Sequence, residues 1–188
     1  GGYYVGKIVD GGQTYALIVA PKAQGESSKA WKPDNTSTPG TQSFSNGLSN
    51  SNAMNNASHP AAQFCRSLTI GGTNDWHLPS LHELEMCYRA FKPSNESNYT
   101  TDNRPSWRSS GYNVPPENGN GHNAASSPVG AAYGASNPGQ TGAAQFKSGG
   151  SEAFTENYYW TSTEFAAFGA WIQNFSLGYQ HFSVKNDS

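Results

Sequence analysis

Residues 158–185 read YYWTSTEFAAFGAWIQNFSLGYQHFSVK, and they carry the clearest secondary-structure pattern of the chain. It holds three runs rich in aromatic and β-branched residues, Tyr158–Thr163, Ala170–Phe175 and Tyr179–Lys185. The short connections between them contain Gly169 and Gly178. Runs of this kind, separated by glycine-containing turns, are typical of antiparallel strands. The sequence therefore predicts a three-stranded meander near the C-terminal end.

Alternation along the middle run assigns its side chains to two faces. Trp171 and Phe175 fall on one face, whereas Ile172 and Asn174 point to the other. We expect Trp171 and Phe175 to lie in the core and the opposite face to be available for contacts. The predicted core comprises Trp76, Leu78, Leu84, Trp160, Trp171 and Phe175.

The N-terminal residues predict a hairpin. Two β-rich runs, residues 3–9 and 13–20, flank Asp10-Gly11-Gly12, and glycine supplies the positive φ that a tight turn requires. Pro21 ends the second run.

Two helices are expected after the hairpin. The first lies within residues 51–69, where Ser58 is the predicted cap and Pro60 suits the first turn. The second begins at Ser80, which forms a capping-box pattern with Glu83, and ends before Pro93. A short further helix is expected near residues 141–146.

Residues 93–138 are rich in Asn, Ser, Gly and Pro and predict a loop-rich insertion. Trp107, Tyr112 and Tyr133 are the residues expected to attach this insertion to the body. The order of hairpin, two helices, long loops and meander predicts one α+β domain over residues 1–188. We expect this domain to be the distal part of a longer chain.

The composition narrows the function. Charged residues make up 13 % of 188 residues and the net charge is −2, which argues against nucleic-acid binding. No apolar run approaches the length of about 18 residues that a membrane span requires, and no signal peptide is visible. Cys65 and Cys87 match no zinc or redox motif, and buried thiols or a disulfide between two helices both remain open.

Catalytic and metal-binding patterns are weak. His77, His82 and Glu83 do not fall on one helical face, and Glu83 and Glu85 point in different directions. No Gly-x-Ser-x-Gly element is present. The calcium-sugar motifs Glu-Pro-Asn and Trp-Asn-Asp are also absent. We expect neither an enzyme nor a bound cofactor, with calcium as the alternative.

Two blocks carry a family resemblance. Asn74–Ser80, followed by Glu83-Leu84, resembles a D-W-R-L-P-T…E-L block, with His77 in place of the usual arginine. Tyr159–Glu164, followed by Ala170-Trp171 and Asn174-Phe175, resembles a Y-W-S-S-T-E…A-W…N-F block. Together they resemble the Lcl C-terminal (DUF1566) domain family, which has a C-type-lectin-like fold. The final V-R-x-V-R strand usual in that family has no counterpart before Ser188.

The resemblance implies a binding scaffold. Members occur in phage tail and receptor-binding proteins, in bacterial adhesins and among the variable proteins of diversity-generating retroelements. The expected function is therefore that of a receptor-binding domain of a phage tail fibre, located on the virion and recognising a glycan or protein of the bacterial surface. We expect a homo-oligomer, such as a trimer in a fibre, with no nucleic-acid partner and no membrane insertion. A bacterial surface adhesin, a structural virion protein and an enzyme of the sulfatase-modifying type are the alternatives.

By location in that fold, the ligand would contact the turn after the first meander strand and one side of the next two strands. Phe165 and Phe168 within this turn are poorly explained by core packing, and exposed apolar groups mark binding sites. The predicted ligand-binding residues are Phe165, Ala166, Ala167, Phe168, Ile172, Asn174, Leu177, Tyr179 and His181.

Overall fold

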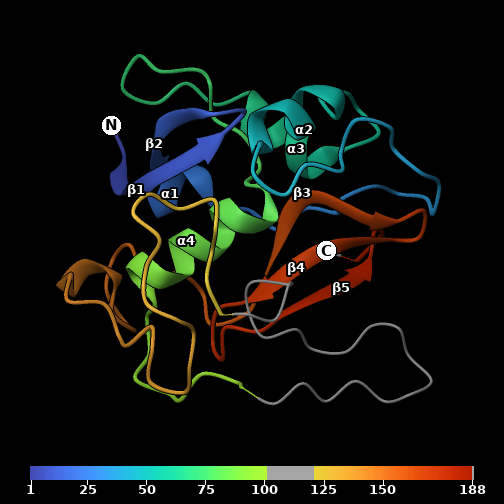
Figure 1. Cartoon of the computed structure of the whole chain (residues 1–188). Helices are drawn as coiled ribbons and strands as arrows, with labels where there is room; N and C mark the ends of the chain where they lie inside the picture. Colours follow the sequence, from blue (N-terminus) through green and yellow to red (C-terminus); the bar gives the residue numbers. More distant parts are fainter. Residues whose placement is uncertain (101–120, 188) are drawn as a thin grey trace.

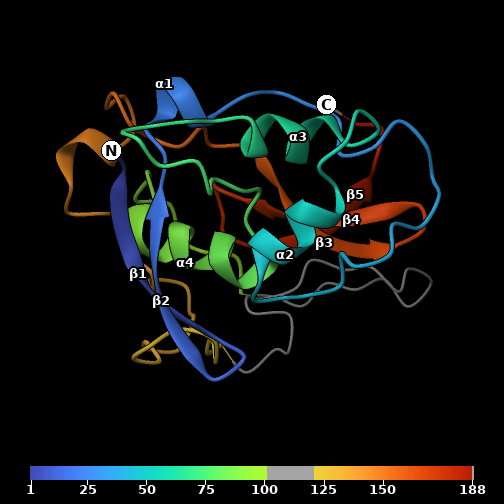
Figure 2. The same cartoon turned by 90° about the horizontal axis from the view of Figure 1, so that it is seen from above.

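Two antiparallel sheets lie on opposite sides of one helix in the computed structural model, which describes residues 1–100 and 121–187. The strands β1 (Tyr3–Asp10) and β2 (Gln13–Val19) form the N-terminal hairpin. The strands β3 (Tyr158–Ala166), β4 (Gly169–Asn174) and β5 (Gln180–Val184) form the meander, in the order β3–β4–β5. Helix α4 (Leu81–Phe91) lies between the two sheets in both views (Figures 1 and 2). The predicted α+β class, hairpin and meander are confirmed.

The hairpin turns where the glycines predict it. Gly11 and Gly12 have φ values of 55° and 80°, the left-handed pair of a type I′ turn, whose twist suits adjoining strands. Asp10 pairs with Gln13 across the turn, and the register continues to Tyr3 and Val19 with one irregularity between Tyr4 and Gly6.

The region of the first predicted helix contains two short helices and a turn. Helix α2 (Gly47–Ala53) overlaps only the first three residues of the predicted range 51–69, and α3 (Pro60–Arg66) lies wholly within that range. Pro60 is the first residue of α3, and its ring disfavours a helical conformation of His59, so the chain cannot be one helix across this point. His59, and not Ser58, is the residue before α3. Gly71 and Gly72 form a separate turn between Ile70 and Thr73.

The remaining helical segments are shorter than α4. A four-residue helix, α1 (Lys22–Gly25), follows the hairpin and was not predicted from the sequence. The helix expected near residues 141–146 is a single 3₁₀ turn, Ala144–Phe146. Of the loop-rich insertion, residues 93–100 and 121–138 are described and contain no helix or named strand. Trp107 and Tyr112 lie outside the described residues.

Helix α4 organises the main core. The Glu83 carboxylate accepts the Ser80 N–H at 2.7 Å, which is one half of the predicted capping box. The buried face of α4 packs against the hairpin on one side and Phe175 on the other. Tyr88 meets Phe175 edge to face, with ring centroids 5.3 Å apart.

A second core cluster surrounds Trp31, which is completely buried. Its indole N–H donates to the Thr161 carbonyl at 2.8 Å and so attaches the loop before α2 to β3. Of the predicted core residues, Leu78, Leu84, Trp171 and Phe175 are buried, whereas Trp76 and Trp160 are only partly buried. Among the described residues, no helix is both long and apolar enough to span a bilayer.

Candidate binding surface

Four aromatic rings meet at the end of the meander where β3 turns into β4. Phe165 and Phe182 are stacked, with centroids 4.3 Å apart and planes within 2°. The edge of Trp171 meets Phe165 at 5.2 Å. Phe168 meets Phe182 at 5.5 Å. We call Phe165, Phe168, Trp171 and Phe182 the aromatic cluster.

Strand register brings these rings together. Trp171 pairs with Phe182 across β4 and β5. The β3–β4 register shifts on both sides of Glu164, and the ring of Phe165 lies against those of Trp171 and Phe182. A Cβ atom on Gly169 would lie 2.9 Å from the Phe182 ring, so only glycine leaves room for the ring beside the turn.

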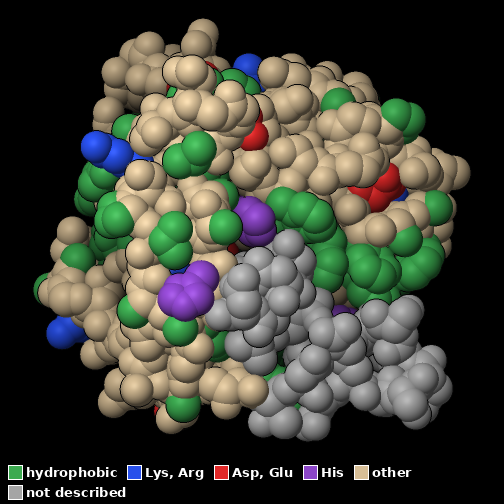
Figure 3. All heavy atoms as spheres, viewed as in Figure 1, with side chains coloured by type: hydrophobic (Ala, Val, Ile, Leu, Met, Phe, Trp, Pro, Cys, Tyr) green, Lys and Arg blue, Asp and Glu red, His purple; other side chains and the backbone are tan. Residues whose placement is uncertain are grey.

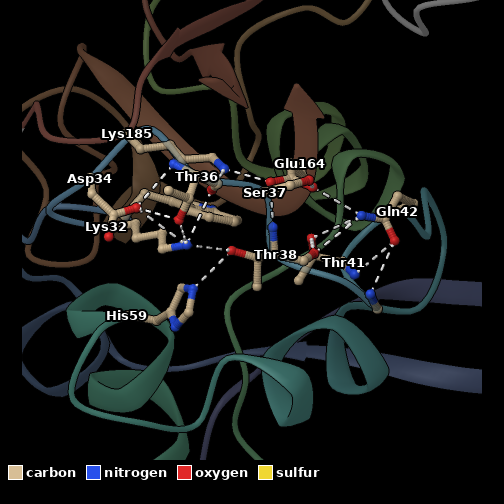
Figure 4. A network of polar contacts seen from close by, with 12 residues as sticks. Lys32, Asp34, Thr36, Ser37, Thr38, Thr41, Gln42, His59, Glu164 and Lys185 are labelled. Atoms are coloured by element: carbon tan, nitrogen blue, oxygen red, sulfur yellow. Dashed lines mark hydrogen bonds and ion pairs between the residues drawn. The ribbon is translucent and has the colours of Figure 1, made fainter. Parts of the chain in front are cut away.

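A buried polar network holds the base of this turn (Figure 4). The Glu164 carboxylate pairs with the ammonium group of Lys185 and accepts the Thr38 N–H at 2.8 Å. The Ser37 hydroxyl and the Gln42 amide each donate to the same carboxylate at 3.0 Å. Lys185 also lies over the Trp31 ring at 4.7 Å. Because Glu164 precedes Phe165, the network fixes the backbone on which the aromatic cluster rests.

Burial and neighbouring charges shift the pKa values of the ionisable groups in this network. Burial alone would raise the pKa of Glu164, but hydrogen bonds from Lys185 and the Thr38 N–H, together with the Lys185 charge, hold it below the ordinary value. Burial lowers the pKa of Lys185, against the opposing effect of Glu164. Burial and the nearby Lys32 and Lys185 charges lower the pKa of His59, which favours its neutral form at pH 7. Glu164 and Lys185 therefore act as an ion pair inside the protein.

Exposure is concentrated at the tip of the turn. Phe168 is 43 % exposed and Ala167 is exposed, whereas Phe165 and Ala166 are partly buried and Trp171 is 9 % exposed. Figure 3 shows a mainly polar, uncharged surface with hydrophobic side chains gathered over the meander. The aromatic cluster thus presents one exposed ring supported by three less accessible ones.

The other face of the meander borders a cavity of about 1060 Å³. Ile172 and His181, paired across β4 and β5, line it together with Trp160. The opposite wall comes from α3 and the β2 strand. Phe64, Cys65 and Trp76 also line this cavity. Ile172 is buried, so it faces this cavity and not an open surface.

Three further residues that were predicted to contact a ligand instead make hydrogen bonds within the protein. The Asn174 side chain is buried and accepts the N–H groups of Ser176 and Leu177 at 2.9 and 2.7 Å, which closes the β4–β5 turn. Tyr179 is buried, and its hydroxyl lies 2.5 Å from that of Tyr158. The Leu177 carbonyl accepts the Tyr99 N–H. The predicted set therefore divides between the exposed turn, the cavity wall and the β4–β5 connection.

Sequence reasoning missed two parts of the surface. Phe182 is not among the predicted contact residues, yet it is partly buried and completes the aromatic cluster. The Glu164–Lys185 pair carries no local sequence signal, because the two residues are joined only by the meander. The alternating pattern is the one sequence signal that could have identified Phe182, because it places Trp171 and Phe182 on the same face of neighbouring strands.

The described residues contain no group of three or more His, Cys, Asp or Glu side chains arranged to hold a metal ion. His77 instead pairs with Glu83 at 3.3 Å, and His82 stacks on Phe44. Cys65 and Cys87 are free thiols. Burial raises the pKa of Cys65 to about 12 and that of Cys87 further, so both are protonated and act as apolar wall groups.

Comparisons with protein-family models, with curated proteins and with solved structures find no match for this chain.

Proposed function

We propose that the chain is a receptor-binding domain of the phage tail-fibre type, with a C-type-lectin-like fold, that recognises a bacterial surface glycan or protein. The single observation that carries this proposal is the aromatic cluster, in which Phe168 is exposed on a turn fixed by a buried ion pair. Exposed aromatic side chains on a rigid frame lose little conformational entropy on binding and serve as anchors. The resemblance of the two sequence blocks supplies the biological setting.

The proposed ligand-contact region contains fewer residues than the set predicted from the sequence. It consists of Phe165, Ala166, Ala167 and Phe168 on the turn, with Phe182 beside them. Ile172, Asn174 and Tyr179 belong to the supporting frame because they are buried. Affinity for a cell would come from a few such anchors, multiplied by several copies in a fibre.

The test is adsorption of the purified protein to a panel of bacterial strains, followed by flow cytometry. Phe168→Ser should abolish adsorption to every strain that the unchanged protein binds, with the thermal unfolding midpoint nearly unchanged. Phe44→Ser is the matched control, since Phe44 is a similarly exposed phenylalanine, 37 % accessible, beside α2. Equal adsorption by the Phe168→Ser protein would refute the proposed contact region, and adsorption to no strain would remove support for a receptor-binding role.

A further inference from the structure

The outer edge of β2 carries hydrogen-bonding groups that nothing in the described chain satisfies. In the type I′ hairpin, Gln13, Tyr15 and Leu17 exchange hydrogen bonds with β1, so the N–H and C=O groups of Thr14, Ala16 and Ile18 point outward. No hydrogen bond to these outward groups is found among residues 1–100 and 121–187. A row of unpaired donors and acceptors in this arrangement is a template for another strand.

Two other strand edges of the molecule are covered. On β1, the Val9 N–H donates to Ala125 and the Lys7 carbonyl accepts from Ser127. On β3, the N–H groups of Ser162 and Glu164 donate to the carbonyls of Pro79 and Thr41. Loops therefore satisfy these edges. At the β2 edge, where Ala16 and Ile18 border the cavity beside α3, no loop among residues 1–100 and 121–187 donates or accepts such a hydrogen bond.

The β2 edge also lacks the features that normally prevent pairing. Exposed edges are usually interrupted by lysine, proline or a bulge. The seven residues of β2 contain no charged residue and no proline, and the irregularity of the hairpin lies in β1. Apolar side chains are exposed around it, since Tyr4, Tyr15 and Ile18 are 57 %, 54 % and 41 % accessible.

We propose that β2 pairs antiparallel with β2 of a second copy of the chain, which joins two hairpins into one four-stranded sheet. A two-fold axis at Ala16 would place Thr14 opposite Ile18 of the partner subunit and form about six hydrogen bonds. An isologous contact brings like charges together, and β2 has none to repel. Within the hairpin, the charge nearest to the axis is Lys7, opposite Ala16, and two such lysines would lie about 14 Å apart, three strand spacings, beyond the Debye length of about 8 Å.

This pairing is independent of the proposed receptor contact, because β2 and the aromatic cluster lie on different sheets. It predicts a dimer whose formation requires the outward N–H of Ala16. Proline at this position removes that donor but no bond to β1, because Ala16 and Lys7 form a non-hydrogen-bonded pair.

The test is sedimentation velocity of the whole chain between about 1 and 100 μM, with three proteins. The unchanged protein should show a reversible monomer–dimer equilibrium in this range, and Ala16→Pro should raise the dissociation constant at least about tenfold. Ala16→Val is the matched control, because it keeps the N–H and suits a strand, and it should dimerise like the unchanged protein.

A circular dichroism spectrum and a thermal midpoint will show that each variant is folded. If Ala16→Pro fails to fold, Ile18→Pro will be used as the test variant, because it removes another outward N–H donor of β2. A protein that stays monomeric at 100 μM would overturn the proposal, as would undiminished dimerisation of a folded proline variant. Loss of cell adsorption by Phe168→Ser with the dimer intact would separate the two proposals.

Discussion

Glu164 and Lys185 form an ion pair in which the carboxylate side chain is 4 % exposed and the lysine side chain is fully buried. The two residues are joined only through the β3–β4–β5 meander, and one of them directly precedes the exposed turn. The pair therefore links the stability of the sheet to the position of the aromatic cluster.

Removing one charge of this pair should be costly. Glu164→Gln leaves the Lys185 ammonium group buried without its paired carboxylate, and we expect the free energy of unfolding to fall by about 3–5 kcal/mol in urea titrations. Glu26→Gln is the control, because its pair with Lys22 is about one-third exposed and should contribute less than about 1 kcal/mol. A double change, Glu164→Gln with Lys185→Met, should recover part of the loss. Equal losses for Glu164→Gln and Glu26→Gln would contradict this role.

Stability should decrease in acid. Hydrogen bonds from Thr36 and the Lys32 charge lower the pKa of Asp34 to about 2, and the pKa of Glu164 is also held below its ordinary value. Both groups titrate near 4 in the unfolded chain, so the folded state binds fewer protons. Their contribution is complete above pH 5 and is lost as the pH falls toward 2. Unfolding measured at pH 6, 4 and 3 should show this decline, and a shallower decline is expected for Asp34→Asn.

Core and surface phenylalanines should respond differently to truncation. Phe175 is fully buried and contacts Tyr88, Phe154 and Tyr159, so Phe175→Ala should lower the free energy of unfolding by about 3–5 kcal/mol. Phe168→Ala should cost less than about 1 kcal/mol because nearly half of the ring is already exposed. Chemical denaturation of both variants measures the difference, and similar costs would show that Phe168 is part of the core.

Gly169 should tolerate no larger residue. A Cβ atom there would lie 2.9 Å from Phe182 and 3.1 Å from the Ser183 carbonyl oxygen, so Gly169→Ala should displace the Phe182 ring and lower stability by about 1–3 kcal/mol. The control is Gly142→Ala, since nothing lies within 4 Å of a Cβ atom at that position. Near-ultraviolet circular dichroism reports the aromatic environment, and unchanged spectra for Gly169→Ala would contradict the contact.

The thiols should be unreactive in the folded protein. Burial raises the pKa of Cys65 to about 12, so almost no thiolate is present at pH 8. Titration with 5,5′-dithiobis(2-nitrobenzoate) should give slow labelling of the native protein and rapid labelling of both cysteines in urea. Fast labelling of one native thiol would show that the cavity beside Cys65 admits small reagents.

Local patterns predicted the elements that depend on local conformation. Gly11 and Gly12 identify the hairpin turn because few other residues adopt positive φ there. Ser80 with Glu83 identifies the start of α4. Alternation of aromatic residues identifies the meander, since a half-buried strand needs a period of two.

The remaining features depend on contacts between distant segments. Trp31 is fully buried and donates to the Thr161 carbonyl, a partner 130 residues away that no local pattern can identify. The register shifts in β3 turn Phe165 toward Phe182, and a strand pattern read from sequence contains no such irregularity. Asn174 and Tyr179 are predicted to contact a ligand but are buried, because strand alternation does not indicate which loops cover a face of the sheet.

Among residues 1–100 and 121–187, six charged residues are buried, three lysines and three glutamates, namely Lys32, Lys92, Lys185, Glu83, Glu85 and Glu164. Their charges cancel, and the whole chain has only 11 basic and 13 acidic residues. The solvent-facing shell is thus poorer in charge than the composition suggests. Copies of the domain can therefore be crowded side by side with little mutual electrostatic repulsion.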